Sequence, residues 1–419
     1  MVDNLLSHSS RSNLTEWLSY LENLHHVEID LGLARIQEVA NLLDIHFDFA
    51  KVITVAGTNG KGTTCAFLEN ALLGEGQSVA VYSSPHIERF NERLRIDHQD
   101  IDDNSLVQAF EQIEKTRGNI SLSYYEYTTL AAFLILMIKK PDIILLEVGL
   151  GGRLDATNII DCDVAVITTI DLDHQAFLGN DRETIAIEKA GIIRANGHVV
   201  VGDIDPPKSL LAYIDKLDAH LVCRNQDFTM SRCNDRWQWQ LAEHIFTDLH
   251  LPHIPIDNVA TALAVLVLLN ISLERDKINQ VIDKTRVAGR AELFNRHCDV
   301  ILDVGHNPQA ARYLAEQLSK MKYRKIYAVV GMLADKDISN VIKPLAPYID
   351  NWYFGTLGVQ RAASANELAG KVSEFSKEFI CFDNVTQAFN IASEKATKHD
   401  LVLVFGSFFT VAEIRRLLI

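Results

Sequence analysis

Short apolar runs recur along the chain up to residue 201, and each is followed by a segment whose apolar residues have helical spacing. The runs cover residues 52–56, 79–82, 143–148, 164–169 and 199–201. Strands that are apolar on both faces are typical of a parallel sheet with helices on both sides. The segments at 63–73, 127–139 and 182–190 are the predicted helices. The pattern therefore predicts an α/β domain with a parallel sheet.

The pattern weakens after residue 202 and resumes after residue 290. Residues 203–250 contain a Pro-Pro pair and an alternating stretch, which favours a small antiparallel insert, and residues 258–269 predict a helix. Apolar runs then return at residues 300–304, 326–330, 352–354 and 401–405. We therefore expect a boundary at residue 288, with one α/β domain over residues 1–288 and a smaller one over residues 289–419.

Composition and charge exclude several classes of protein. The 40 basic and 55 acidic residues leave a net charge of −15, which argues against a nucleic-acid coat protein or a basic membrane-surface protein. The longest apolar runs, 130–138 and 262–269, are far shorter than the roughly 20 residues that span a bilayer. The N-terminal ten residues do not have the pattern of a signal peptide, and the six cysteines are scattered, without a Cys-x-x-Cys pair. We expect free thiols and a cytoplasmic protein.

A glycine-rich segment between the first run and the first helix has the composition of a phosphate-binding loop. Glycines allow backbone N–H groups to surround phosphate oxygens, a lysine adds a positive charge, and a hydroxyl can reach a bound magnesium ion. The spacing departs from the common Gly-x4-Gly-Lys-Ser/Thr form, and the alternative is a glycine-rich turn with an exposed lysine. The predicted ATP-binding residues are Gly57, Thr58, Asn59, Gly60, Lys61, Gly62, Thr63 and Thr64.

Two further polar residues come at the carboxyl ends of predicted strands. Glu147 ends the 143–148 run, and His174 follows the 164–169 run. Ligands of open α/β sheets bind at this edge, and a carboxylate oxygen suits magnesium. The alternatives are a structural ion pair for Glu147 and a satisfied structural role for His174.

Motifs spread over nearly the whole chain resemble the folylpolyglutamate synthase and dihydrofolate synthase family, within the Mur-ligase-like amide synthetases. Segments 17–25 and 29–33 resemble the bifunctional bacterial members. The other matching motifs are Ser83-Ser84-Pro85-His86-Ile87, Glu92-Arg93, Glu147-Val-Gly-Leu-Gly-Gly-Arg-Leu-Asp155-Ala-Thr-Asn158, Asp173-His174, Glu188-Lys189-Ala-Gly191, Asn258, Gly289-Arg290, Asp303-Val-Gly-His306-Asn-Pro308 and Gly406-Ser407-Phe408.

The resemblance implies a phosphate-loop domain followed by a Rossmann-like α/β domain, and it assigns roles around the nucleotide. It implies that Asn258 and Asp303 lie near the base or ribose and that Arg290 contacts phosphate, although Arg290 could instead form a linker salt bridge. The implied Mg²⁺ ligands are Ser84, Glu147 and His174. Lys61, His174 and Lys189 are the implied catalytic residues. Lys189 can be carbamylated in the family, whereas its position near a helix end by itself favours a solvated lysine.

The resemblance also implies two substrate sites. Residues expected to bind folate are Leu31, Gly32, Leu33, Ser123, Tyr125 and Asp155, although Ser123 and Tyr125 could simply pack. His306 and Ser407 follow strands of the second domain, where glutamate is expected to enter, and both could equally cap loops.

The implied activity is ATP-dependent ligation of L-glutamate to dihydropteroate and to reduced folates through an acyl phosphate. Each of these ligands is an anion, so in an acidic chain the positive field must be local. We expect a monomer that binds neither nucleic acid nor membrane. Two rivals are an amide ligase acting on a muramoyl precursor and a regulatory protein that binds ATP without chemistry. The Asp30 to Leu33 and Asp155 segments disfavour the first, and the joint presence of Glu147, His174 and Lys189 disfavours the second.

Overall fold

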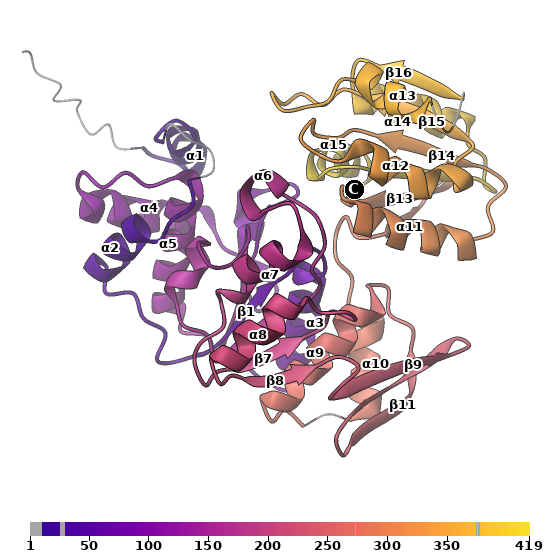
Figure 1. Cartoon of the computed structure of the whole chain (residues 1–419). Helices are drawn as coiled ribbons and strands as arrows, with labels where there is room; N and C mark the ends of the chain where they lie inside the picture. The colour runs from indigo at the N-terminus through magenta and orange to yellow at the C-terminus, as the bar shows by residue number, and fades with distance from the viewer. Residues whose placement is uncertain (1–10, 26–29, 273, 374, 376–377) are drawn as a thin grey trace, which may run out of the picture.

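A computed structural model describes residues 11–25, 30–272, 274–373, 375 and 378–419, and it shows two α/β units (Figure 1). The first is built on an eight-stranded sheet, which is followed in the chain by a three-stranded antiparallel sheet. The second is built on a six-stranded sheet. The predicted α/β class with mainly parallel sheets is confirmed.

Strand β1 lies inside the eight-stranded sheet, between β5 and β6. Thr54 pairs in parallel with Leu146 on one side and Ala165 on the other, so the carboxyl ends of these three strands are neighbours. The strand order is β4-β3-β2-β5-β1-β6-β7-β8, with β3 and β4 antiparallel. The strands are β1 (Lys51–Ala56), β2 (Val79–Tyr82), β3 (Leu94–Ile96), β4 (Gln99–Asp100), β5 (Ile143–Glu147), β6 (Val164–Ile167), β7 (His198–Val201) and β8 (His220–Cys223).

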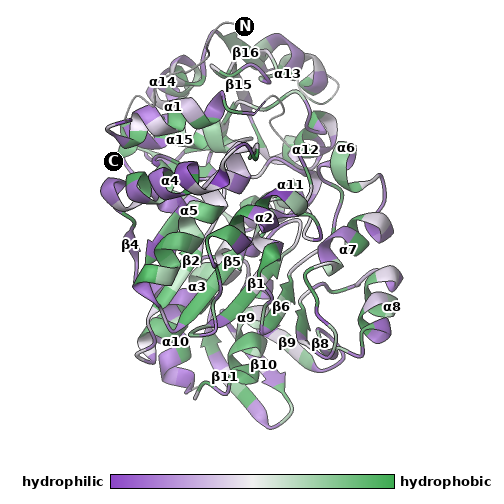
Figure 2. Ribbon diagram, turned by 90° about the vertical axis from the view of Figure 1, so that its left-hand side faces the viewer, coloured by the Kyte–Doolittle hydropathy of each residue, from purple (hydrophilic) through white to green (hydrophobic). Residues whose placement is uncertain are grey.

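Helices cover both faces of this sheet because its strands are apolar on both sides. Ile53 and Val55 face the core that contains α3, whereas Val52 faces the core that contains α5. These central strands are coloured as hydrophobic in Figure 2. The first face carries α3 (Lys61–Gly74), α9 (Ile256–Leu268) and α10 (Arg275–Lys284). The other carries α1 (Leu14–Glu22), α2 (Ala34–Leu42), α4 (Asp103–Arg117), α5 (Tyr124–Lys139), α7 (Arg182–Ala190) and α8 (Lys208–Lys216).

The segment after β7 differs in part from its prediction. The antiparallel insert is confirmed for β9 (Phe228–Cys233), β10 (Arg236–Leu241) and β11 (His244–His250), which place Trp237 and Trp239 in the core beside α9. The prediction is wrong for residues 203–227. There α8 leads to β8, and β8 is the last strand of the eight-stranded sheet. Strand β8 is a short edge strand and is partly exposed, so it lacks the apolar pattern of a buried strand.

The second unit has a similar layered arrangement. Its strand order is β12-β13-β17-β14-β15-β16, and only β12 is antiparallel to its neighbour. The strands are β12 (Glu292–Asn295), β13 (Asp299–Asp303), β14 (Ile326–Val330), β15 (Asn351–Gly355), β16 (Phe379–Phe382) and β17 (Leu401–Phe405). One face carries α11 (Pro308–Lys320), α12 (Ile338–Leu345) and α13 (Ala365–Val372), and the other α14 (Val385–Lys395) and α15 (Phe408–Leu418).

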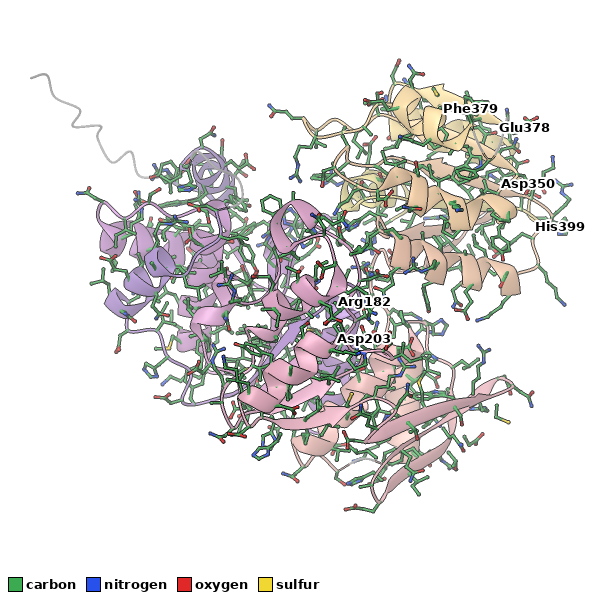
Figure 3. All side chains as sticks on the ribbon, viewed as in Figure 1. Arg182, Asp203, Asp350, Glu378, Phe379 and His399 are labelled. Carbon is green, nitrogen blue, oxygen red and sulfur yellow. The ribbon has the colours of Figure 1, made fainter. Side chains whose placement is uncertain are left out.

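The loop after β6 is anchored by an ion pair labelled in Figure 3. Arg182 at the start of α7 pairs with Asp203 after β7 at 3.2 Å. Arg182 Nε also donates to the carbonyl of Ile170, and Asp203 accepts from the Ile170 N–H. These bonds fix the segment that carries residues 171–174. Across the described ranges, no helix is both long and apolar enough to cross a membrane.

Candidate active site

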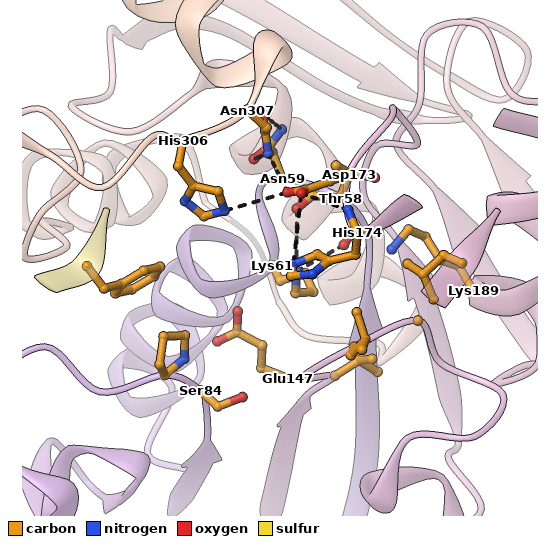
Figure 4. A pocket seen from close by; sticks show the side chains of 18 of the residues that line it. Thr58, Asn59, Lys61, Ser84, Glu147, Asp173, His174, Lys189, His306 and Asn307 are labelled. Carbon is orange, nitrogen blue, oxygen red and sulfur yellow. Dashed lines mark hydrogen bonds and ion pairs between the residues drawn. The ribbon is translucent and has the colours of Figure 1, made fainter. Parts of the chain in front are cut away.

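Loops from both units converge above the carboxyl ends of β1, β5 and β6. The loop after β1, the loop after β5 and segment 173–174 form one side, and residues 305–307 after β13 form the other. Together they line a cavity of about 100 Å³. Figure 4 shows Lys61, Glu147 and His174 directed into this cavity, with Lys189 on its wall. Of the residues predicted from the sequence, it brings together Gly57, Thr58, Asn59, Lys61, Ser84, Glu147, His174, Lys189, Arg290 and His306.

The glycine-rich loop has a fixed shape. Gly60, with φ +95°, precedes α3, and a side chain there would collide with Asn258. Glycine is therefore required at this position on both conformational and steric grounds. Thr168 Oγ1 donates to the Asn59 carbonyl at 2.7 Å, and Thr58 Oγ1 donates to the Asp171 carbonyl at 3.0 Å. The loop is thus held against the segment that follows β6.

Lys61 is the first residue of α3 and points back over the loop. Its Nζ donates to the carbonyls of Gly57 at 2.9 Å and Thr58 at 3.5 Å. Burial lowers its pKa, against the opposing charge of Glu147. This position suits an ammonium group that exchanges loop carbonyls for phosphate oxygens.

Glu147 is a buried residue at the end of β5, with 7% of its surface exposed. No hydrogen bond or ion pair involves its carboxylate in the part of the chain that the structure describes, so the predicted alternative of a structural ion pair is not observed. Burial raises its pKa, and the nearby Lys61 charge opposes this. An unpartnered buried carboxylate is costly unless a cation reaches it. With the Ser84 hydroxyl in the same cavity, the donor set fits a hard divalent cation.

His174 belongs to a second cluster, which joins the two units. Ligand atoms of Asp173, His174 and His306 lie within 4.8 Å of one another. Burial lowers the pKa of His174 to about 4, so its imidazole is neutral and can donate a lone pair. Asp173 also pairs with Lys336 at 2.9 Å and accepts a hydrogen bond from Asn307 at 3.0 Å.

Lys189 is buried in the last turn of α7, with 4% exposure. The solvated lysine favoured by its sequence position is therefore wrong, because the cavity covers the end of this helix. Burial lowers the pKa of Lys189 to about 7, and the positive charge of Lys61 acts in the same direction. A substantial fraction of the amine is therefore neutral at physiological pH.

A second cavity of about 120 Å³ adjoins the glycine-rich loop and collects the other predicted nucleotide residues. Asn258 donates to Thr63 Oγ1 at 2.7 Å, and Asp303 accepts from the N–H groups of Ala291 and Gly305. The predicted residues that line it are Asn59, Gly60, Gly62, Thr63, Asn258, Arg290 and Asp303, whereas Thr64 is buried in α3 outside it. Its walls also include His253, Gln309 and Tyr313, which sequence patterns missed. Tyr313 was missed because an aromatic residue on an amphipathic helix resembles a core residue, and neither the loop residue His253 nor Gln309 lies in a motif that indicates a nucleotide.

An amide bridge connects the glycine-rich loop to the second unit. Asn59 and Asn307 exchange two side-chain hydrogen bonds, each 3.0 Å long. Asn307 also caps α11 by accepting from the Ala310 N–H. The sequence signal was an Asn-Pro pair, which is typical of a helix start, but it did not identify the contact across the cleft.

The predicted folate residues gather around one end of α5. Tyr125 and Asp155 pack against Gly149, which lines the central cavity. Ser123 caps α5 by accepting from the Glu126 N–H. Residues Leu31, Gly32 and Leu33 lie on the segment that Asp30 ties to Arg35 at 2.5 Å, and Arg35 also pairs with Glu126 at 3.2 Å. Residue 29 of the matching motif lies outside the described residues, and none of these six residues lines the cavities named above.

The predicted glutamate residues line a third cavity of about 680 Å³, which opens from the first between the two units. His306 Nδ1 lies 2.9 Å from the carbonyl of Val304. Ser407 Oγ accepts from the Thr410 N–H at 3.0 Å and caps α15. Both therefore have a local structural role as well as a place on the cavity wall.

Comparison with known proteins identifies what the chain is similar to. The Mur ligase middle domain model matches residues 55–268, and the model of the Mur ligase glutamate ligase domain matches residues 289–408. The chain is 43% identical to the dihydrofolate synthase/folylpolyglutamate synthase of Haemophilus influenzae, over 98% of each chain. The structure of Escherichia coli FolC in complex with DHPP and ADP aligns with a TM-score of 0.93 at 42% identity, covering 97% of this chain and 98% of that one. The structure of the bifunctional Yersinia pestis enzyme with AMPPNP and an Mn ion aligns with a TM-score of 0.91 at 45% identity, covering 98% of each chain.

Proposed function

The chain belongs to the Mur ligase family, within its dihydrofolate synthase/folylpolyglutamate synthase members, and on this premise we propose how its residues share the reaction. The protein is an ATP-dependent ligase that joins L-glutamate to dihydropteroate and to folates. The observation that carries the residue assignments is the meeting of the glycine-rich loop, an unpartnered buried carboxylate and the second unit at one cleft.

The reaction needs activation because a carboxylate is a poor acyl electrophile. Transfer of the γ-phosphoryl group of ATP to the acceptor carboxylate forms an acyl phosphate and releases ADP. The amine of glutamate then attacks the acyl carbon, loses a proton and displaces inorganic phosphate. Lys61, Arg290 and the loop N–H groups hold the phosphates, and Asn258 and Asp303 lie near the base or ribose. This chemistry depends mainly on positioning and on stabilisation of developing charge.

We propose Mg²⁺ as the divalent cation, held by Ser84, Glu147 and His174. The hard carboxylate and hydroxyl oxygens and the neutral imidazole support this choice. When bound, the ion neutralises the negative charge on the phosphoryl oxygens. Tyr125, Asp155, Ser123 and residues 31–33 are proposed for the pteridine end of the acceptor, and His306 and Ser407 for glutamate.

We also propose that residues 1–288 act as the unit for ATP and folate and residues 289–419 as the unit for glutamate. A monomer in the cytoplasm is proposed on the net charge of −15 and the free cysteines. Size-exclusion chromatography coupled to light scattering tests the oligomeric state, and a dimer mass would overturn it.

The assignment of substrates is tested by offering purified protein ATP, Mg²⁺ and L-glutamate with one acceptor at a time. We expect dihydrofolate from dihydropteroate and glutamate-extended product from tetrahydrofolate, each identified by mass spectrometry. ATP turnover should require both the acceptor and glutamate. Acceptor-independent ATP hydrolysis without any ligated product would instead support a regulatory ATP-binding protein.

The lowered pKa of Lys189 predicts reactivity toward CO₂. A neutral amine forms an N–C bond with CO₂ and releases a proton, whereas a protonated amine has no lone pair to attack. Because the pKa of Lys189 is lowered to about 7, its neutral fraction at pH 7 is much larger than that of an ordinary lysine with a pKa near 10.4. In ¹³C-labelled bicarbonate we expect a carbamate resonance. Its intensity should decrease as the pH is lowered below 7 at a fixed concentration of dissolved CO₂. Lys189→Arg should lack this resonance, and its persistence in that variant would contradict the assignment.

A further inference from the structure

Two arginines from different units line the third cavity without a carboxylate partner. Arg93 lies in the short helix η1 (Phe90–Arg93), and Arg416 lies in α15. Within the described ranges, no ion pair involves either guanidinium. The neighbouring Arg415 is different, because it pairs with both Glu88 and Glu292. The same cavity is also lined by Glu88, Asp335 and Glu413, but among the described residues none of them pairs with Arg93 or Arg416. Two guanidinium groups without a carboxylate partner make this wall a candidate site for an anion.

The guanidinium of Arg93 is held in a defined orientation. Its Nε donates to His86 Nδ1 at 2.9 Å, which leaves both terminal NH₂ groups available. The guanidinium carbon lies 5.5 Å from the ring centre of Phe90 and 5.6 Å from that of Tyr124. A planar fork that is fixed in this way suits bidentate binding of a carboxylate. Arg416 donates to the Glu88 carbonyl at 3.3 Å, which adds a second positive charge from the other unit.

Arg93 lies on the acceptor side of the cavity. Tyr124, over which it packs, precedes Tyr125 at the start of α5, where the proposed folate residues gather. The residues proposed for glutamate, His306 and Ser407, belong to the second unit. The cavity also shares Gly149 and His174 with the reaction cavity. An acceptor that extends from α5 to the reaction centre therefore passes Arg93.

The two acceptors differ in one charged group near the reacting carboxylate. Dihydropteroate ends in a benzoate, and its only carboxylate is the one that reacts. A folate ends in a glutamyl group, whose γ-carboxylate reacts while its α-carboxylate does not. Because each added glutamate restores the same terminus, one site for the α-carboxylate would serve every round of extension.

We infer that Arg93, assisted by Arg416, binds the non-reacting α-carboxylate of the glutamyl terminus of folate acceptors. This inference rests on the proposed function and makes Arg93 a determinant of specificity between the two acceptors. The site is needed for folate extension and is dispensable for dihydrofolate synthesis.

The first test compares kcat/KM for the two acceptors in Arg93→Gln at saturating ATP, Mg²⁺ and glutamate. Loss of a charge-assisted hydrogen bond predicts a decrease of about 10- to 100-fold for tetrahydrofolate. The value for dihydropteroate should stay within about twofold, because this acceptor has no second carboxylate for Arg93 to bind. Arg93→Lys should recover part of the loss. Arg232→Gln, which removes an exposed positive charge from β9, is the matched control.

The second test removes the ligand group instead of the arginine. A tetrahydrofolate analogue with an α-carboxamide should be a poorer substrate of the wild-type protein by the same factor as Arg93→Gln with tetrahydrofolate. The analogue should lose little more in Arg93→Gln, because the interaction is already absent. Additive losses in the double combination would show that Arg93 does not bind this carboxylate.

Other results overturn the inference in distinct ways. An equal loss for both acceptors together with a higher KM for L-glutamate would assign the arginines to the incoming amino acid. Unchanged values for both acceptors would remove any role in binding. Failure of the wild-type protein to extend either acceptor would count against the proposed function itself, and it would be seen before any variant is compared.

Discussion

Lys61→Ala should abolish product formation with both acceptors while the chain remains folded. The ammonium group lies over the glycine-rich loop, where it donates to the carbonyls of Gly57 and Thr58. Removing one preorganised donor from developing charge typically decreases kcat by about 10²–10³-fold, and in the proposed function the same group also positions the phosphates. We therefore expect a loss of at least about 10³-fold.

The fold should tolerate this change, since burial lowers the pKa of Lys61 and thus already penalises its charged form. Product formation by mass spectrometry and the thermal midpoint by calorimetry measure the two effects. Lys51→Ala is the matched control, because Lys51 starts β1 and pairs with Asp163 on the surface. Full activity of Lys61→Ala would refute the assignment of the phosphate loop.

Glu147→Gln should separate activity from stability. The substitution keeps the shape of the side chain but removes the anionic ligand, so we expect about a 10³-fold lower rate and a much higher Mg²⁺ requirement. Burial raises the folded-state pKa of Glu147. Stability that is present below the unfolded pKa is then lost as pH rises through the folded pKa, so the ionised group destabilises the metal-free protein at neutral pH.

The metal-free Glu147→Gln protein should consequently unfold at the same temperature as the wild type or higher. Adding Mg²⁺ to the ATP-bound protein should raise the wild-type midpoint further and leave that of the ATP-bound variant almost unchanged. Glu75→Gln, at the opposite end of α3, serves as the control. A variant with wild-type Mg²⁺ dependence would exclude Glu147 as a metal ligand.

Much of this fold was predictable because the central strands of its two large sheets are almost fully buried. The runs at β1, β5 and β17 have no polar face, and a parallel sheet covered on both sides is the arrangement that buries them. Strand β8 was missed because it is a partly exposed edge, and α8 was missed with it. A search for continuous apolar runs does not identify partly exposed edge strands or the helices that precede them.

The candidate site was predictable where local sequence determines chemistry. The loop from Gly57 to Thr64 is contiguous, and Glu147 follows directly from the end of a strand. The burial of Lys189 and the bond between Asn59 and Asn307 were not predictable in this way. Both depend on how segments far apart in the chain pack together, and no local pattern encodes that packing.

The amide bridge between Asn59 and Asn307 has a consequence for exchanging parts among related enzymes. Each of these side chains satisfies the other across the cleft, and Asn307 also binds Asp173. A second unit transplanted from a relative without an asparagine at this position would remove the donor to Asn59 Oδ1, although Asn59 Nδ2 could still donate to a residue placed like Gln309. In chimeras of this family, the residues at positions 59 and 307 should therefore be taken from the same parent.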